Sequence, residues 1–285
     1  MQTTPNPSDS STNSLTLSTC QAPNMDFLSR DLADYLSRHL GFPVRLRIDI
    51  PWTERDRLLD AGEIDLCWIC GLPYVRKAAR APGKIAPLVA PVMTGSRYQD
   101  RPIYFSDVVV RADSPFQTLA DLRGAAWAYN EPGSQSGFGV VVYSLAARGL
   151  TLAFFGRVVE SGAHQNSIQM ILRREVDASA IDTTVLEQEL GDHPEIGPQI
   201  RVIDTFGPSP IPPWVVSERV DPATREKLRE ELARMHTRAE GQAILKKAGI
   251  ARFAAVDDAD YDPIREMARI GFGETFARNQ SYAGG

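Results

Sequence analysis

The feature that most restricts the fold of this chain is a strand–helix alternation that runs in two series. In the first series, strands are predicted at 14–20, 43–50 and 63–70, and each is followed by a helical segment. Period-two alternation favours a strand, and apolar residues at helical spacing favour a helix. Repeated strand–helix units are typical of α/β folds in which helices cover a parallel sheet.

The second series indicates how the chain is divided. It begins after a long strand expected at 102–115 and ends with a returning strand in IRVIDTFG. We therefore expect lobe one to comprise 14–107 plus 206–285 and lobe two to comprise 108–205, after a disordered tail at 1–13. Two chain crossings would form a hinge, and a cleft between lobes is a common ligand site.

Composition narrows the function classes. The 285 residues are 43% hydrophobic and 24% charged, with a net charge of −5 and no basic block, so nucleic acid is not an expected partner. No apolar run approaches the roughly 20 residues that span a membrane. The first residues lack the basic and apolar regions of a secretory signal, so the chain as written is expected to stay in the cytoplasm.

The three cysteines do not suggest a disulfide framework. Cys67 and Cys70 have C-x-x-C spacing, but they end a strand-like run, whereas a redox motif would open a helix. A zinc site would need two more ligands nearby. We therefore expect buried or pocket-wall thiols, and no bound metal or cofactor.

The most informative motif is YNEPGSQSGFG, which joins a strand to a helix start. It resembles the nucleophile elbow G-x-S-x-G, but Gln135 occupies the place of the nucleophile. It also lacks the lysine of the NTPase phosphate loop. Unpaired N–H groups at the helix start, with the hydroxyls of Ser134 and Ser136 and the small Gly137, would suit an anion. The alternative is an ordinary helix start with serine as its N-cap.

Three other residues have comparable alternatives. Tyr104, at the expected hinge, could face the cleft or pack as a strand aromatic. His164 begins a predicted helix after a Ser-Gly turn, where its imidazole could donate to an anion or serve the structure alone. Asp182 ends a strand, where it could cap the next helix or accept a hydrogen bond from a ligand.

Taken in order, several segments resemble the phosphonate/phosphite/phosphate-type substrate-binding proteins of ABC transporters. These segments are GEIDLCWICGLPYV, PIYFSDVVVRADSPFQTLADLRG, WAYNEPGSQSG, SGAHQNSIQM, VDASAID and GPSPIPPWVVS, and the resemblance covers roughly 15–270. It implies the type II periplasmic-binding-protein fold, an α/β architecture of two lobes, each a mixed sheet flanked by helices, with two hinge crossings. It also implies a monomer, a permease partner and a periplasmic or cell-surface location.

In that family a hinge tyrosine, a serine-rich helix start and a histidine hold the oxyanion of the ligand. Tyr104, the turn at 134–137 and His164 match them, with Gln135 where threonine is usual. The resemblance thus favours the anion site over an ordinary capped helix.

The resemblance also bears on the rest of the ligand. Members that bind aminoalkylphosphonates pair the amine with two acidic residues; Asp182 lies close to one such position, but no carboxylate aligns with either. A small oxyanion, or one with a neutral or apolar tail meeting Trp214, fits better. Asn24 and Tyr74 are candidates for the wall contributed by lobe one, with packing inside that lobe as the alternative.

Together these features predict a non-enzymatic protein that captures a small oxyanion of the phosphonate, phosphite or phosphate class by hinge closure, for uptake or ligand sensing. The alternative is an enzyme on the same fold, similar to the thiamine-pyrimidine synthases. Such an enzyme would need several clustered cysteines.

Overall fold

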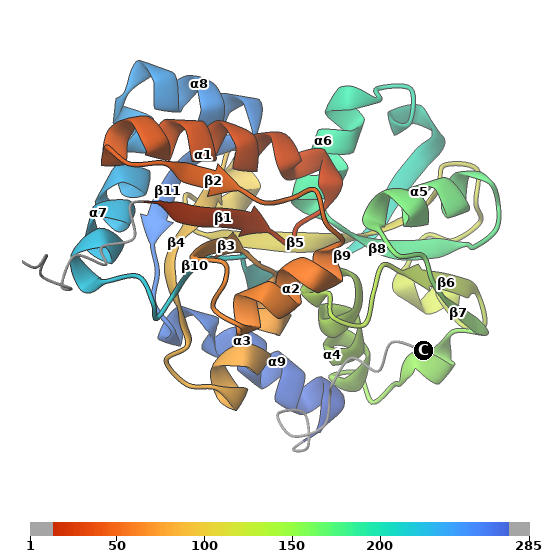
Figure 1. The fold of residues 1–285 in the computed structure, drawn as a ribbon. Helices are drawn as coiled ribbons and strands as arrows, with labels where there is room; N and C mark the ends of the chain where they lie inside the picture. Colours follow the sequence, from red (N-terminus) through yellow and green to blue (C-terminus); the bar gives the residue numbers. More distant parts are fainter. Residues whose placement is uncertain (1–13, 274–285) are drawn as a thin grey trace, which may run out of the picture.

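Two separate mixed sheets organise the chain, and they lie side by side in Figure 1. The computed structural model describes residues 14–273, so the tail predicted at 1–13 lies outside the described residues. The first sheet has the strand order β11 (Ile250–Ala255), β4 (Ile85–Met93), β10 (Trp214–Ser217), β3 (Leu66–Trp68), β1 (Leu15–Thr19) and β2 (Val44–Leu46). The second has the order β7 (Arg157–Glu160), β6 (Ala126–Tyr129), β8 (Ala178–Asp182), β5 (Ile103–Arg111) and β9 (Ile200–Pro210).

Helices cover both faces of the first sheet. Figure 1 shows α1 (Asp26–Leu40), α7 (Pro222–Ala233) and α8 (Ala239–Lys247) on one face, with α2 (Trp52–Asp60), α3 (Gly71–Arg80) and α9 (Asp262–Phe272) on the other. β1 pairs in parallel with both β2 and β3, while β10 and β11 run antiparallel to their neighbours. The parallel part therefore matches the predicted strand–helix repeat, and returning strands complete the sheet.

The second sheet is also covered on both faces. Val108 and Val110 of β5 pack with α4 (Val140–Ala146), whereas Val109 packs with residues of α5 (His164–Leu172) and α6 (Thr183–Asp192). Successive strand residues point to opposite faces, so one apolar strand serves two cores. The expected α/β architecture of two mixed sheets flanked by helices is thus present.

Several predicted elements differ from the structure. The strands expected at 43–50 and 63–70 shorten to β2 and β3, and the one expected at 102–115 ends at Arg111. Strands β4, β10 and β11 were not predicted. β4 reads IAPLVAPVM, a buried run with two prolines and no polar alternation, so period-two analysis has little to detect there.

Strands β5 and β9 carry the chain between the lobes. Tyr104, near the start of β5, packs into the core of the first sheet, whereas Val108 packs into the second. The predicted lobe boundaries fall opposite each other inside the β5–β9 ladder, where Asp107 pairs with Thr205. The division into 14–107 plus 206–285 and 108–205 stays a prediction.

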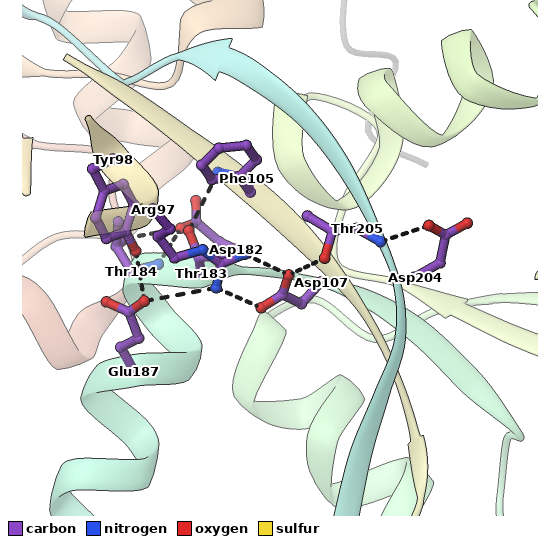
Figure 2. Close-up of polar contacts among 10 residues, drawn as sticks. All are labelled: Arg97, Tyr98, Phe105, Asp107, Asp182, Thr183, Thr184, Glu187, Asp204 and Thr205. Atoms are coloured by element: carbon purple, nitrogen blue, oxygen red, sulfur yellow. Dashed lines mark hydrogen bonds and ion pairs between the residues drawn. The ribbon is translucent and has the colours of Figure 1, made fainter. Parts of the chain in front are cut away.

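A polar cluster fastens the segment between β4 and β5 to the second lobe, as Figure 2 shows. The Arg97 guanidinium donates to both carboxylate oxygens of Asp107 at 3.0 and 2.9 Å. The Thr205 hydroxyl donates to the same carboxylate at 2.7 Å, and the Tyr98 hydroxyl donates to Glu187 on α6 at 2.7 Å. Asp107 is buried, and a buried carboxylate without partners would destabilise the fold, so the hydrogen bonds of this cluster offset that cost.

No helix in the range 14–273 combines the length and the apolar character that crossing a membrane requires.

Candidate functional site

A cavity of about 160 Å³ lies between the two lobes. This is smaller than the roughly 300–1,000 Å³ typical of sites for drug-sized molecules, so it suits a small ligand. The lining residues from lobe one are Cys20, Gln21, Ala22, Pro23, Trp52, Arg55 and Cys70. Those from lobe two are Asn130, Glu131, Ser134, Ser136, Gly162, Ala163, His164, Asp182 and Val185.

The serine-rich turn both caps a helix and faces this cavity. Ser134 has extended backbone, and its hydroxyl accepts from the Gly137 N–H at 3.0 Å. Residues Gln135–Gly139 form a π-helical turn that leads into α4. A Cβ on Gly137 would lie 1.9 Å from the Asn130 side-chain oxygen, so any larger residue there would have to displace the Asn130 side chain. The N-cap alternative therefore holds for Ser134, while both serines still line the cavity.

His164 stands at the first position of α5 and is only 5% exposed. Its Nε2 lies 3.1 Å from the Ser136 hydroxyl, and its Nδ1 has no hydrogen-bond partner among the described residues. Burial lowers the pKa of the imidazole to about 4, so the ring is neutral at pH 7. A neutral imidazole carries one N–H, so His164 can donate one hydrogen bond without adding charge.

Tyr104 lies behind the serine turn rather than on the cavity surface. It is 1% exposed, and its hydroxyl has no partner with good hydrogen-bond geometry within residues 14–273, although the Ser136 hydroxyl and the Cys70 thiol lie close enough to affect its pKa. Its polar neighbours are Cys70, Asp182 and Ser136, all of which line the cavity. Burial raises the pKa of the phenol well above its ordinary value, so the group remains a neutral donor. An orphaned buried hydroxyl is unusual and favours a partner that arrives with the ligand.

Two carboxyl groups also line the cavity. Asp182 caps α6 by accepting from the Thr184 N–H at 2.9 Å and the Thr184 hydroxyl at 2.8 Å, close to the cluster in Figure 2. Burial raises the pKa of Asp182 to about 6. Burial also raises the pKa of Glu131 to about 7, with further repulsion from Glu160 and Asp56. Both acids are thus held in an environment that disfavours negative charge.

Several lining residues were not predicted, among them Arg55, Asn130 and Glu131. Arg55, on α2, is buried and donates to the Thr19 carbonyl at 2.7 Å. Its sequence context, WTERDRLLD, is an ordinary charged helix and does not mark this arginine. Asn130 and Glu131 directly precede the serine turn, so their adjacency to the motif could have identified them.

The structure places two predicted wall residues elsewhere. Tyr74 is 1% exposed on α3, packs edge-on against Tyr261 and donates to Asp258, so it is not an exposed wall residue. Asn24 lies within a short 3₁₀ turn before α1 and is not among the residues that line the cavity. Its amide instead donates to Glu189 of α6 at 3.1 Å and so bridges the lobes beside the cavity.

Two further expectations about side-chain direction are corrected. The Gln135 amide donates to Ser209 at 3.4 Å, and only its backbone N–H approaches the cavity, through a bond to the Cys70 sulfur at 3.3 Å. Trp214 is fully buried in β10 and stacks on Trp68, so it does not meet a ligand tail in this cavity.

The cysteines occupy the places that the spacing suggested. Cys67 is buried in β3, while Cys20 and Cys70 are partly exposed and line the cavity. Burial raises the pKa of the Cys70 thiol to about 11, which makes it a poor nucleophile. Residues 14–273 contain no group of three or more His, Cys, Asp or Glu side chains arranged to hold a metal ion.

Comparison with known proteins identifies the family. A model of the periplasmic phosphonate substrate-binding proteins of ABC transporters matches residues 17–261. This chain belongs to that family. A curated relative, the phosphonates-binding periplasmic protein of Escherichia coli (strain K12), is 28% identical over 213 residues. That match covers 73% of this chain and 61% of the relative, so the chain spans less than two thirds of its length.

Solved structures confirm the fold. The binding-protein component of an ABC phosphonate transporter from Pseudomonas aeruginosa has a TM-score of 0.79 at 18% identity, covering 95% of this chain and 90% of its own. PhnD1 from Prochlorococcus marinus (MIT 9301), in complex with methylphosphonate, has a TM-score of 0.80 at 17% identity, and the match covers 92% of this chain and 99% of PhnD1. The family and the two-lobe type II fold expected from the resemblance are therefore both confirmed.

Proposed function

We propose that this chain is the solute-binding protein of an ABC-type uptake system and captures a small phosphonate, phosphite or phosphate. The observation that supports this most is the convergence of Ser134, Ser136 and His164, from two separate helix starts, on one small cavity. Tyr104 adds an unpaired hydroxyl behind the same wall. The family's description places such proteins in the periplasm, where we propose that this chain works with a permease.

The proposed binding chemistry uses mainly neutral donors. Hydroxyl, imidazole and helix-start N–H groups each contribute about 1.5–3 kcal/mol when they bond to an anion. Several such bonds support micromolar or tighter affinity. Arg55 supplies a positive charge on the lobe-one side, although one of its amino groups already serves the Thr19 carbonyl.

We further propose that ligand capture accompanies closure of the lobes. The bonds from Asn24 to Glu189 and from the Gln135 N–H to Cys70 join the lobes on either side of the cavity. A ligand that contacts both walls binds the closed arrangement more tightly and shifts the population toward it. Strands β5 and β9, which cross between the lobes, would act as the hinge.

A thermal-stability screen against phosphate, phosphite, methylphosphonate and sulfate tests this function. A ligand at 100 times its dissociation constant should stabilise the protein by about 2.7 kcal/mol. Ser136→Ala and His164→Ala should abolish the shift while leaving the ligand-free melting temperature nearly unchanged. The proposed function is wrong if no oxyanion stabilises the wild-type protein, or if both variants keep the full shift.

A further inference from the structure

Arg55 is a buried guanidinium that the protein itself leaves largely unused. It lies on α2, is 8% exposed and lines the cavity between the lobes. Its Nη1 donates to the Thr19 carbonyl at 2.7 Å, whereas its Nε is buried without a hydrogen-bond partner among the described residues. A guanidinium has five N–H donors. Arg55 therefore retains free donors at the cavity wall.

The positive charge of Arg55 also has no direct partner. Asp56, the next residue, forms its ion pair with Lys77 of α3, at 2.9 Å. Burial raises the pKa of Asp26, and the charge of Arg55 offsets part of that rise, yet these two side chains form no ion pair in the described part of the chain. A buried charge without a partner destabilises a fold. This arrangement favours an anion that arrives as a ligand.

The surrounding structure holds Arg55 in place. Thr19 ends β1 and is itself buried, and its carbonyl fixes one end of the guanidinium. The Lys77 ammonium bonds to Asp60 at 2.7 Å as well as to Asp56, so two ion pairs fasten α2 to α3. A planar guanidinium that is already positioned loses little conformational freedom when it binds an anion.

The rest of the lining offers an anion no other positive charge. Within the described lining, Arg55 is the one lysine or arginine, and His164 is neutral at pH 7. Glu131 and Asp182 also line the cavity, and their carboxyl groups repel an oxyanion whenever they are ionised. The hydroxyls of the serine turn donate hydrogen bonds without charge. Arg55 is thus the counter-charge that this part of the chain provides.

We propose that Arg55 determines the affinity for the oxyanion from the lobe-one side, by donating from Nε and one terminal amino group to two of its oxygens. The planar fork of a guanidinium matches two oxygens of a phosphate-like group. The inference rests on the proposed function, because it assumes that an oxyanion occupies this cavity. It adds the residue that neutralises the ligand and bonds to it from across the cavity.

Two substitutions separate the charge of Arg55 from its bond to Thr19. Arg55→Gln keeps an amide N–H that can serve the Thr19 carbonyl but removes the charge and the fork, so methylphosphonate should bind about 100-fold more weakly. Arg55→Lys keeps the charge but has no fork, so it should bind about 10-fold more weakly than wild type.

Calorimetric titration of the wild type and both variants with methylphosphonate tests the proposal, with the ligand-free melting temperature of each variant measured alongside. Arg57→Gln is the matched control, because Arg57 is the exposed arginine of the same helix, pairs with Glu54 and does not line the cavity. This variant should bind methylphosphonate as tightly as wild type.

The possible outcomes distinguish the role of Arg55 from oxyanion capture itself. The proposal is overturned if Arg55→Gln binds as tightly as wild type, or if the two Arg55 variants lose affinity equally, which would indicate that the residue only supports the Thr19 carbonyl. If Arg55→Gln does not fold, Arg55→Lys decides, and wild-type affinity in that variant overturns the proposal. In each case oxyanion capture stands. The proposed function fails only if the wild-type protein binds neither methylphosphonate nor phosphate.

Discussion

The carboxyl group of Glu131 gives the sharpest test of the physical picture of the cavity. Burial raises its pKa from 4.5 to about 7, with the largest charge contribution from Glu160. Because the folded-state pKa is the higher one, the folded state binds this proton more tightly than the unfolded chain does. The resulting stabilisation is complete below pH 4.5 and is lost as pH rises through about 7.

The magnitude follows from the size of this difference. One pKa unit corresponds to about 1.4 kcal/mol, so the whole pKa difference of Glu131 would change the free energy of unfolding by roughly 3 kcal/mol. Glu131 is only partly buried, so we expect about 2 kcal/mol after screening by solvent. Glu131→Gln removes the titrating group. The ligand-free variant should therefore match wild type near pH 4.5 and exceed it by about 2 kcal/mol at pH 8.

Differential scanning calorimetry of both ligand-free proteins between pH 4.5 and 8 measures this effect. About 2 kcal/mol corresponds to a melting-temperature difference of roughly 4–8 °C for a chain of this size class. Asp182 titrates in both proteins and cancels from the comparison. Glu226→Gln, which changes an exposed carboxyl group of α7 outside the cavity lining, is the control and should follow wild type at every pH. A difference that does not change with pH, or a wild type that is the more stable protein at pH 8, would refute the reasoning.

Three other substitutions test separate parts of the structure. Gly137→Ala places a Cβ 1.9 Å from the Asn130 oxygen, so it should destabilise the fold by about 1–3 kcal/mol in calorimetry and weaken methylphosphonate binding. Arg97→Met leaves the buried Asp107 without its two guanidinium bonds and should cost about 3 kcal/mol in denaturant unfolding; no loss would show that the cluster is dispensable. Tyr104→Phe removes an unpaired hydroxyl, so the ligand-free melt should not fall, while titration should show roughly 10-fold weaker phosphonate binding.

The sequence was informative where local chemistry and position coincide. Ser134, Ser136 and His164 stand at helix starts that directly follow predicted strands. Helices that follow neighbouring parallel strands begin at the same edge of the sheet, so a shared cavity for these residues could be anticipated. Asp182 likewise has the capping role that its place after a strand suggested. The strand–helix repeat gave the α/β class because its periodicity is strong.

What the sequence did not reveal depends on packing between distant segments. Nothing near Arg55 distinguishes it from Arg57, the exposed arginine of the same helix, because the burial of Arg55 results from contact with the end of β1. Tyr74 was expected at the cleft wall, yet its hydroxyl donates to Asp258, a residue of the same lobe that lies far along the chain. The orientation of Gln135 is set by Ser209, which also comes from a distant strand. Contacts with residues that are distant in the sequence leave no recognisable pattern in the residues next to them.

The most direct test of the account is a crystal structure of the protein grown with methylphosphonate. We predict one ligand in the cavity between the lobes, with its oxygens within hydrogen-bond distance of the Ser134 and Ser136 hydroxyls and the His164 imidazole. A ligand held elsewhere, or one in this cavity that contacts none of these three groups, would contradict the account.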